Sequence, residues 1–201
     1  LGKLPIGLSE LDVDTAAFSA HKLHGPMGVG ALYVRRGRAI SPVLRGGGPQ
    51  SGLRSGTENV PGIVGFGVAA ELAAAYLQDY GQITRRHRDR LASLLQAALP
   101  QLEVLSSETG LPNTLLIRLP GIEAEQVLAL APHVAASAGS ACATMSPEPS
   151  HVLVSLLGDV AAATECLRLS VSRYTTDEEV TAGAERIAAA ARTAGKLRAA
   201  S

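Results

Sequence analysis

The sequence predicts an α/β fold, because strand-like segments alternate along the chain with segments of helical periodicity. Hydrophobic residues make up 46% of the 201 residues, which is enough to bury a substantial core. The composition also changes between residues 80 and 100, which indicates two lobes. We therefore expect an α/β protein whose two lobes divide between residues 80 and 100.

The first part is predicted to contain two strands and a long helix. Residues 13–19 and 29–35 are apolar and β-prone, and a turn rich in Gly and Pro connects them. Residues 46–62 have little side-chain volume and are expected to form a loop of backbone amides. From residue 63 to 80, apolar residues recur at helical spacing, interrupted by glycines that mark close packing.

The second part is predicted to begin with a helix over 82–99, which Pro100 ends. The run RRHRDR in this helix is expected to form a solvated face. The later elements are expected as strands at 102–105, 114–119, 133–136 and 167–172, and as helices at 123–131, 150–157 and 177–198. Thr176 and Glu179 form a capping-box pattern at the start of the last helix, and residues 137–150 form a loop of small residues.

The charge balance excludes a strong overall attraction to nucleic acid or to an anionic membrane. Lys and Arg number 18, as do Asp and Glu, so the formal net charge is zero. No apolar run approaches the roughly 20 residues that span a bilayer, and no secretory leader is recognisable. We expect a cytoplasmic protein with no nucleic-acid or membrane partner.

Lys22 is the first candidate for chemistry. It lies in FSAHKLHGPMGVGALYV, which is more apolar company than surface lysines usually have. A half-buried lysine amine beside an anion-binding turn is suited to forming a Schiff base, since desolvation favours the nucleophilic amine. Ser19 and His21 could donate hydrogen bonds to a phosphate. A surface or structural lysine is the alternative, and the glycines match neither a dinucleotide-binding nor a P-loop pattern.

The two cysteines have different surroundings. Cys142 lies among Ser, Ala and Gly, so we expect an accessible thiol on an adaptable backbone. Cys166 precedes a β-prone run and is expected in the core. A disulfide between them is disfavoured in a reducing cytosol.

Arg168 lies inside the apolar segment LRLSVS, where a charged group needs a partner. Its planar guanidinium suits a carboxylate bidentately, and the alternative is an internal salt bridge to a glutamate. His21 and His24 have no cysteine or carboxylate cluster nearby in the sequence, so no metal site is predicted.

Four blocks of the sequence together resemble signature motifs of the cysteine desulfurases of the NifS/IscS type. In chain order they are SAHKLHGPMGVGALYVRR, LRGGGPQSGLRSGTENVPGIVGFGVA, SAGSACATMSPEPSHVL and LRLSVSRYTTDEEV. These enzymes use pyridoxal 5'-phosphate (PLP), belong to the class V aminotransferase group and have the aspartate aminotransferase-like fold, fold type I. The resemblance implies that residues 1–80 end the large PLP-binding domain. Residues 81–201 would then be the small domain with the catalytic-cysteine loop.

The resemblance also implies cofactor ligands. Lys22 resembles the lysine that binds PLP covalently and later shuttles the α-proton of the substrate. Ser19 and His21 resemble phosphate ligands. Thr57, in RSGT, resembles a residue that reaches the phosphate bound by the neighbouring subunit, which implies a homodimer.

For the substrate, Arg168 resembles the arginine that binds the carboxylate of L-cysteine, and Cys142 resembles the sulfur-accepting nucleophile. The implied reaction converts L-cysteine to L-alanine and leaves a persulfide on Cys142. The sulfur then passes to an acceptor protein, such as an iron–sulfur scaffold, for iron–sulfur cluster or thio-cofactor assembly.

The sequence also departs from the family pattern. Met27 replaces a usual lysine, and Pro49 and Gln50 stand near a usual glutamate or histidine. The family's D-A-x-Q motif, which contacts the cofactor ring, would fall before Leu1. We therefore expect an incomplete fragment that is inactive by itself. The alternatives are a related class V lyase or aminotransferase, such as a selenocysteine lyase, and a non-catalytic truncated copy that acts as an interaction module.

Overall fold

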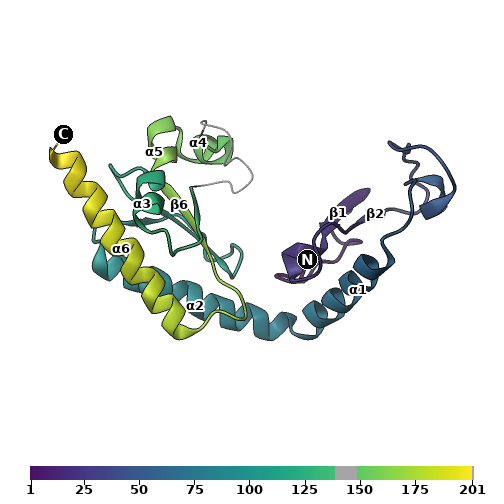
Figure 1. Ribbon diagram of the computed structural model, residues 1–201, viewed down its shortest axis with the longest axis horizontal. Helices are drawn as coiled ribbons and strands as arrows, with labels where there is room; N and C mark the ends of the chain where they lie inside the picture. The colour runs from purple at the N-terminus through teal and green to yellow at the C-terminus, as the bar shows by residue number, and fades with distance from the viewer. Residues whose placement is uncertain (139–148, 201) are drawn as a thin grey trace. The chain divides into compact units, whose positions relative to one another are not determined.

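The computed structural model describes residues 1–138 and 149–200 (Figure 1). The chain divides into two compact units, Leu1–Asp79 (unit 1) and Tyr80–Ser201 (unit 2). Each unit contains helices and a β-sheet of its own. The predicted α/β class is therefore confirmed.

Unit 1 is built from a β-hairpin and a long helix. Its elements are β1 (Thr15–Ser19), the 3-10 helix η1 (Ala20–Leu23), β2 (Gly30–Val34), the 3-10 helix η2 (Pro49–Gly52) and α1 (Val60–Ala75). The strands are antiparallel, with Ser19 opposite Gly30, as the strand–turn–strand pattern predicts. The helix expected over 63–80 begins earlier because Asn59 caps it, accepting a hydrogen bond from the Gly62 amide at 3.1 Å.

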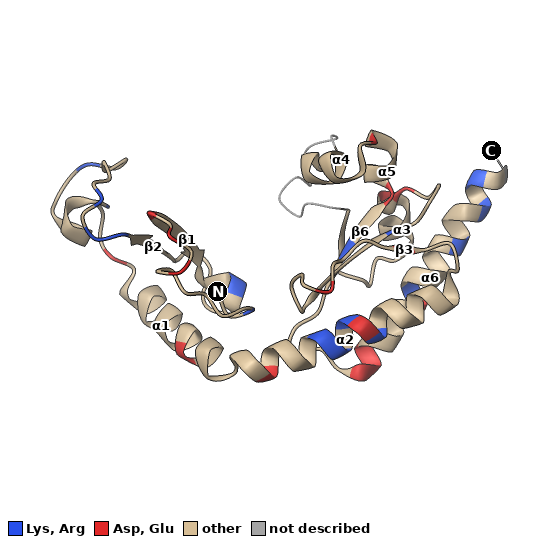
Figure 2. Ribbon diagram, turned by 180° about the vertical axis from the view of Figure 1, so that it is seen from behind, with Lys and Arg blue, Asp and Glu red and all other residues tan. Residues whose placement is uncertain are grey.

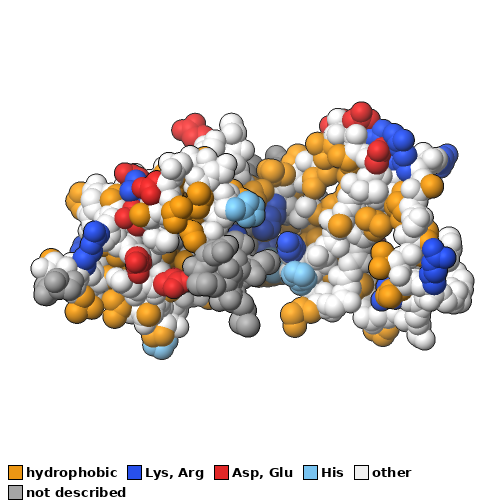
Figure 3. Space-filling model, turned by 90° about the horizontal axis from the view of Figure 1, so that it is seen from above, with side chains coloured by type: hydrophobic (Ala, Val, Ile, Leu, Met, Phe, Trp, Pro, Cys, Tyr) orange, Lys and Arg blue, Asp and Glu red, His pale blue; other side chains and the backbone are white. Residues whose placement is uncertain are grey.

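The helix α1 carries an apolar stripe on its exposed side. Val60, Val64, Val68 and Leu72 recur every fourth residue and are 57%, 60%, 52% and 42% exposed. Figure 3 shows hydrophobic side chains (orange) at the surface. Such a stripe is normally covered by another protein surface. Among the described residues no single helix could span a membrane by length and composition, and α1 with α2 meets that test only as a bent pair.

Unit 2 is a four-stranded antiparallel sheet with helices against both faces (Figure 1). Its elements are α2 (Leu77–Ala98, which begins within unit 1), β3 (Glu103–Val104), β4 (Thr114–Arg118), α3 (Ala124–Leu130), β5 (Ser137–Ala138), α4 (His151–Leu157), α5 (Val160–Thr164), β6 (Cys166–Ser170) and α6 (Asp177–Ala200). The strand order is β3-β4-β6-β5, so β6 is central.

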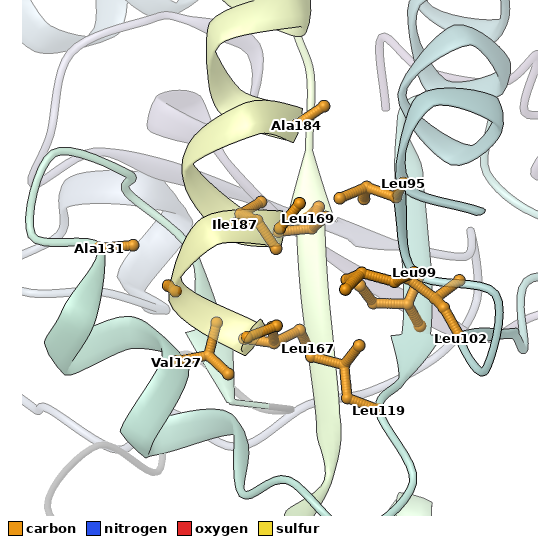
Figure 4. Close-up of a cluster of buried hydrophobic side chains, with 14 of the residues drawn as sticks. Leu95, Leu99, Leu102, Leu119, Val127, Ala131, Leu167, Leu169, Ala184 and Ile187 are labelled. Carbon is orange, nitrogen blue, oxygen red and sulfur yellow. The ribbon is translucent and has the colours of Figure 1, made fainter. Parts of the chain in front are cut away.

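Alternate residues of β6 face two separate hydrophobic clusters. Leu167 and Leu169 lie in the main core, with residues from α2, α3 and α6 (Figure 4). Cys166 lies in a smaller cluster with Leu153 of α4. Because successive strand residues point to opposite faces, Arg168 shares its face with Cys166 and not with the main core.

Local signals in the sequence are reflected in the ends of the helices. At the start of α6, the Glu179 amide donates to Thr176 Oγ1 at 3.2 Å, and the Thr176 amide donates to Glu179 Oε2 at 2.8 Å. The predicted capping box is therefore confirmed. The short helix α5 was not predicted; Asp159 caps it by accepting a bond from the Ala161 amide at 2.9 Å. The strand expected at 133–136 lies instead at β5, where it pairs with β6.

The prediction that RRHRDR, residues 85–90, forms a solvated face is wrong for two residues. His87 and Arg88 are only 3% and 7% exposed, whereas the other three arginines are exposed. Arg88 Nη2 lies 2.6 Å from Asp89 Oδ1, and Arg88 Nη1 donates to the Leu111 carbonyl at 3.3 Å. The run, drawn in blue and red along α2 in Figure 2, therefore turns one side toward the interior of unit 2.

Candidate functional site

Lys22 lies in η1, directly after the hairpin strand β1. Ser19 is the last residue of β1, and His21 precedes the lysine, so three polar side chains occur within four residues. The turn ends at His24, whose φ of 65° is in the left-handed region. The end of β1 and the 3-10 helix after it therefore carry an amine, a hydroxyl and an imidazole close together along the backbone.

This turn is held against α1 by close packing. Ala20 and Leu23 are 0% and 6% exposed. A Cβ added at Gly65 of α1 would lie 2.6 Å from Pro26 Cγ, far inside contact distance. Gly65 therefore marks close packing, as the sequence predicts. A Cβ added at Gly67 would meet nothing within 4 Å in the described chain.

We expect Gly65→Ala to destabilise the protein by about 1–3 kcal/mol, because the new methyl group must displace Pro26 and the lysine turn. The matched control is Gly67→Ala on the same helix, which should stabilise by up to about 1 kcal/mol through helix propensity. Urea unfolding of both variants of the full-length protein measures the difference. Equal effects of the two substitutions would contradict the proposed contact.

The burial expected for Lys22 is not found within this chain. Lys22 and His21 are exposed and Ser19 is half-buried, because the inward positions of the turn are occupied by Ala20 and Leu23. None of the three polar side chains makes a hydrogen bond or ion pair within the described residues. Their polar groups therefore remain available to a ligand.

The uncommitted groups fit PLP by their chemistry. The Lys22 amine is the group that bonds an aldehyde, while the Ser19 hydroxyl and the His21 ring are hydrogen-bond donors for a phosphate. Thr57 lies in unit 1 between η2 and α1, is exposed, and also has no side-chain partner among the described residues. The adjacent Glu58 accepts a hydrogen bond from Gln50 Nε2 at 2.7 Å, which ties Thr57's segment to η2.

Arg168 lies in the middle of β6 and is half-buried. Its cross-strand neighbours are Leu116 on β4 and Ser137 on β5. Within the described residues its guanidinium has neither a hydrogen-bond nor an ion-pair partner. Because this guanidinium has no internal partner there, it is available to bind an external carboxylate through two parallel hydrogen bonds.

The internal salt bridge considered as the alternative belongs to a different arginine. Arg118, at the end of β4, donates from Nε to Glu165 at 2.8 Å and from Nη1 to Glu103 at 3.1 Å. Hydrogen bonding to Glu165 is the main cause of its raised pKa. Arg118 was not predicted as a site residue, although it too is an arginine in an apolar strand. Because Glu103 and Glu165 both form salt bridges with Arg118, they do not pair with Arg168.

Only Cys166 of the two cysteines lies within the described residues. Cys142 lies outside them, while Ser137, five residues before it in the sequence, lies directly opposite Arg168. Cys166 is fully buried, and its Sγ lies 3.4 Å from the carbonyl oxygen of Ala162. Burial raises the pKa of the Cys166 thiol, which disfavours a nucleophilic thiolate there. The prediction of Cys166 as a core residue is confirmed.

The structure brings together the residues that are neighbours in sequence, namely Ser19, His21 and Lys22. Arg168 belongs to the other unit. Such a chain, with a lysine turn on a hairpin and an arginine on a second sheet, has the aspartate aminotransferase-like fold, fold type I. A solved NifS-like protein is 37% identical, with a TM-score of 0.82 over 94% of this chain and 49% of that one. A NifS-like protein from Rickettsia africae is 30% identical, with a TM-score of 0.83 over 94% of this chain and 50% of that one.

The family model for class-V aminotransferases matches residues 1–182, and the chain belongs to that family. It is 45% identical over 183 residues to a cysteine desulfurase of Gluconacetobacter diazotrophicus, covering 90% of this chain and 46% of that protein. It is 43% identical, with the same coverage, to the cysteine desulfurase NifS of Azotobacter vinelandii. The predicted resemblance is confirmed, and PLP is the cofactor of this family. The chain spans about half the length of these relatives.

Proposed function

We propose that the full-length protein containing this chain is a PLP-dependent cysteine desulfurase. It would convert L-cysteine to L-alanine and hold the released sulfur as a persulfide on Cys142. The observation that carries the proposal is that the guanidinium of Arg168, a half-buried residue in the middle of β6, has no partner among the described residues and suits a carboxylate. The two relatives named above are both called cysteine desulfurases, which supports the same substrate.

Each side chain has a distinct task in substrate binding. Arg168 binds the α-carboxylate of L-cysteine through two parallel hydrogen bonds, which orients the amino acid. Lys22 holds the cofactor, with Ser19 and His21 donating to its phosphate and Thr57 to that of the partner subunit. The bound cofactor supplies an electron sink for the substrate's α-carbon. The Nζ amine of Lys22 accepts the α-proton and later returns a proton to the product.

The sulfur step belongs to Cys142. Its thiolate attacks the sulfur of the substrate, so that a sulfur–sulfur bond forms while the substrate's carbon–sulfur bond breaks. The electron pair of the broken bond stays on carbon, which takes up a proton and becomes the methyl group of L-alanine. Ser137, which lies opposite Arg168, precedes Cys142 by only five residues in the sequence, which supports a thiol within reach of the substrate that Arg168 binds.

Two further features support the proposed assembly and location. The exposed apolar stripe of α1 is suited to burial in a homodimer, which Thr57's proposed role requires. We also propose a cytoplasmic location, where the buried Cys166, which has no disulfide partner among the described residues, would stay reduced. The persulfide would pass to a sulfur-acceptor protein, such as an iron–sulfur scaffold, for iron–sulfur cluster or thio-cofactor assembly.

The test is the production of sulfide and L-alanine from L-cysteine by the full-length protein in the presence of a thiol reductant. We expect Arg168→Ala to raise KM about 30-fold or more, because losing one partner of a desolvated charge pair costs about 2 kcal/mol or more. The matched control is Arg118→Ala, on the neighbouring strand, which should lower stability and leave KM within about twofold. An unchanged KM in Arg168→Ala, or a wild-type protein that forms no alanine, would refute the proposal.

A further inference from the structure

The C-terminal end of β6 is held by a buried side chain, Asn113, which is 4% exposed and directly precedes β4. The Val171 amide donates to the Asn113 carbonyl at 2.9 Å. In the other direction, Asn113 Nδ2 donates to the Val171 carbonyl at 3.2 Å. These bonds continue the β4–β6 pairing one step beyond its last pair, Thr114 with Ser170. The side-chain amide of Asn113 thus donates an inter-strand hydrogen bond at the point where the regular pairing of β4 and β6 ends.

A second brace holds Asn113 in place from the side of α2. Arg88, which is 7% exposed, donates from Nη1 to the Leu111 carbonyl at 3.3 Å. The intervening Pro112 is fully buried. The segment of residues 111–113 is therefore hydrogen-bonded to Arg88 of α2 through Leu111. Through Asn113, the same segment is hydrogen-bonded to Val171 at the end of β6.

Arg168 lies in β6, three residues before Val171, which directly follows the last residue of that strand. In a strand, the position of each side chain depends on the backbone register of the whole strand. Leu167 and Leu169 set which face Arg168 points to, because they are buried in the main core. They do not prevent the strand end from moving outward at Ser170, which is exposed. The bonds to Asn113 restrain that movement.

We propose that Asn113 is a positioning residue for the α-carboxylate of the amino-acid substrate, and that it acts through Val171 on the guanidinium of Arg168. This inference rests on the proposed function of Arg168. Asn113 itself does not touch the substrate. Since binding of a carboxylate by a planar guanidinium depends on geometry, a small displacement of β6 weakens binding and leaves the later chemical steps largely unchanged.

The test measures the dissociation constant of L-alanine, the product of the proposed reaction, which has no sulfur to donate, by calorimetry on the full-length holoprotein. We expect Asn113→Ala to weaken binding about tenfold and Asn113→Asp, which replaces the donor by an acceptor, to weaken it further. The control is Thr84→Val, which removes another fully buried hydrogen bond of unit 2, from Thr84 Oγ1 to the Tyr80 carbonyl at 2.6 Å. This control should lower the melting temperature without changing the dissociation constant.

A double-mutant cycle separates positioning from general destabilisation. In an Arg168→Lys background, adding Asn113→Ala should weaken L-alanine binding less than it does in the wild type, because the planar fork that it positions is gone. Additive effects, or an Asn113→Ala dissociation constant equal to that of the wild type, would overturn the inference. If Asn113→Ala does not fold, the dissociation constant of Asn113→Asp is compared with that of the wild type in its place. Asn113→Gln, which keeps the amide donor, is expected to bind L-alanine more tightly than Asn113→Asp. A wild-type protein without desulfurase activity would overturn the proposed function itself, whereas normal activity with unaffected Asn113 variants would overturn only this inference.

Discussion

Replacing Lys22 by alanine is expected to abolish covalent attachment of PLP and to reduce desulfurase activity about a thousandfold or more, since the same amine binds the cofactor and moves the α-proton. The lysine turn should keep its fold, because its packing depends on Ala20 and Leu23 and the Lys22 side chain is exposed. The loss would therefore be chemical and not structural.

Covalent attachment is measured on the full-length protein by visible absorbance and by mass spectrometry after borohydride reduction. The control is Lys196→Ala, an exposed lysine of α6, which should keep both the absorbance and the reduced adduct. A Lys22→Ala protein that still gives the covalent adduct would show that another amine holds the cofactor. In that case the role assigned to the turn would be wrong.

Replacing Cys142 by serine is expected to lower the formation of L-alanine and sulfide about a thousandfold or more, because the sulfur-accepting nucleophile is removed. The matched comparison is Cys166→Ala. Cys166 is fully buried and its thiol pKa is raised by burial, so its thiolate is scarce at neutral pH. The Cys166 variant should therefore lose stability, by about 1 kcal/mol, and keep its activity.

Mass spectrometry of the protein after reaction with L-cysteine locates the persulfide. Both cysteines lie in one tryptic peptide, residues 119–168, so fragmentation of that peptide must assign the added sulfur. We expect it on Cys142 and not on Cys166. A persulfide on Cys166, or equal losses of activity in the two variants, would contradict the assignment of the nucleophile. Retention of full desulfurase activity in Cys142→Ser would favour a related lyase that needs no protein thiol.

Much of the fold was predictable because its signals are local. The hairpin of β1 and β2 follows from two apolar runs around a glycine-rich turn, and the start of α6 follows from Thr176 and Glu179. The elements that escaped prediction or were displaced are the short ones. β5 has two residues and forms through pairing with β6, while α5 is a five-residue helix whose inner side packs with Cys166. Tertiary contacts and not propensity stabilise both.

The candidate site was predictable where its residues are neighbours in sequence. Ser19, His21 and Lys22 occur in one turn, as expected, but the exposure of the lysine depends on which residues of η1 pack inward. The burial of His87 and Arg88 likewise could not be read from RRHRDR, because the carbonyl that Arg88 meets belongs to Leu111, on a separate segment. Helical charge runs look the same whether or not another segment covers one side.

The sequence by itself determined the fold class, the family pattern, the lysine turn and the core position of Cys166. Only the tertiary structure decided which arginine of the sheet is internally neutralised. The register of the four strands places Arg118 of β4 opposite Glu103 and Cys166, where it reaches Glu165. The same register places Arg168 of β6 opposite Leu116 and Ser137. Strand pairing brings together residues that are far apart in the chain. The pairing, and not the composition, therefore determines which charged side chain finds a partner.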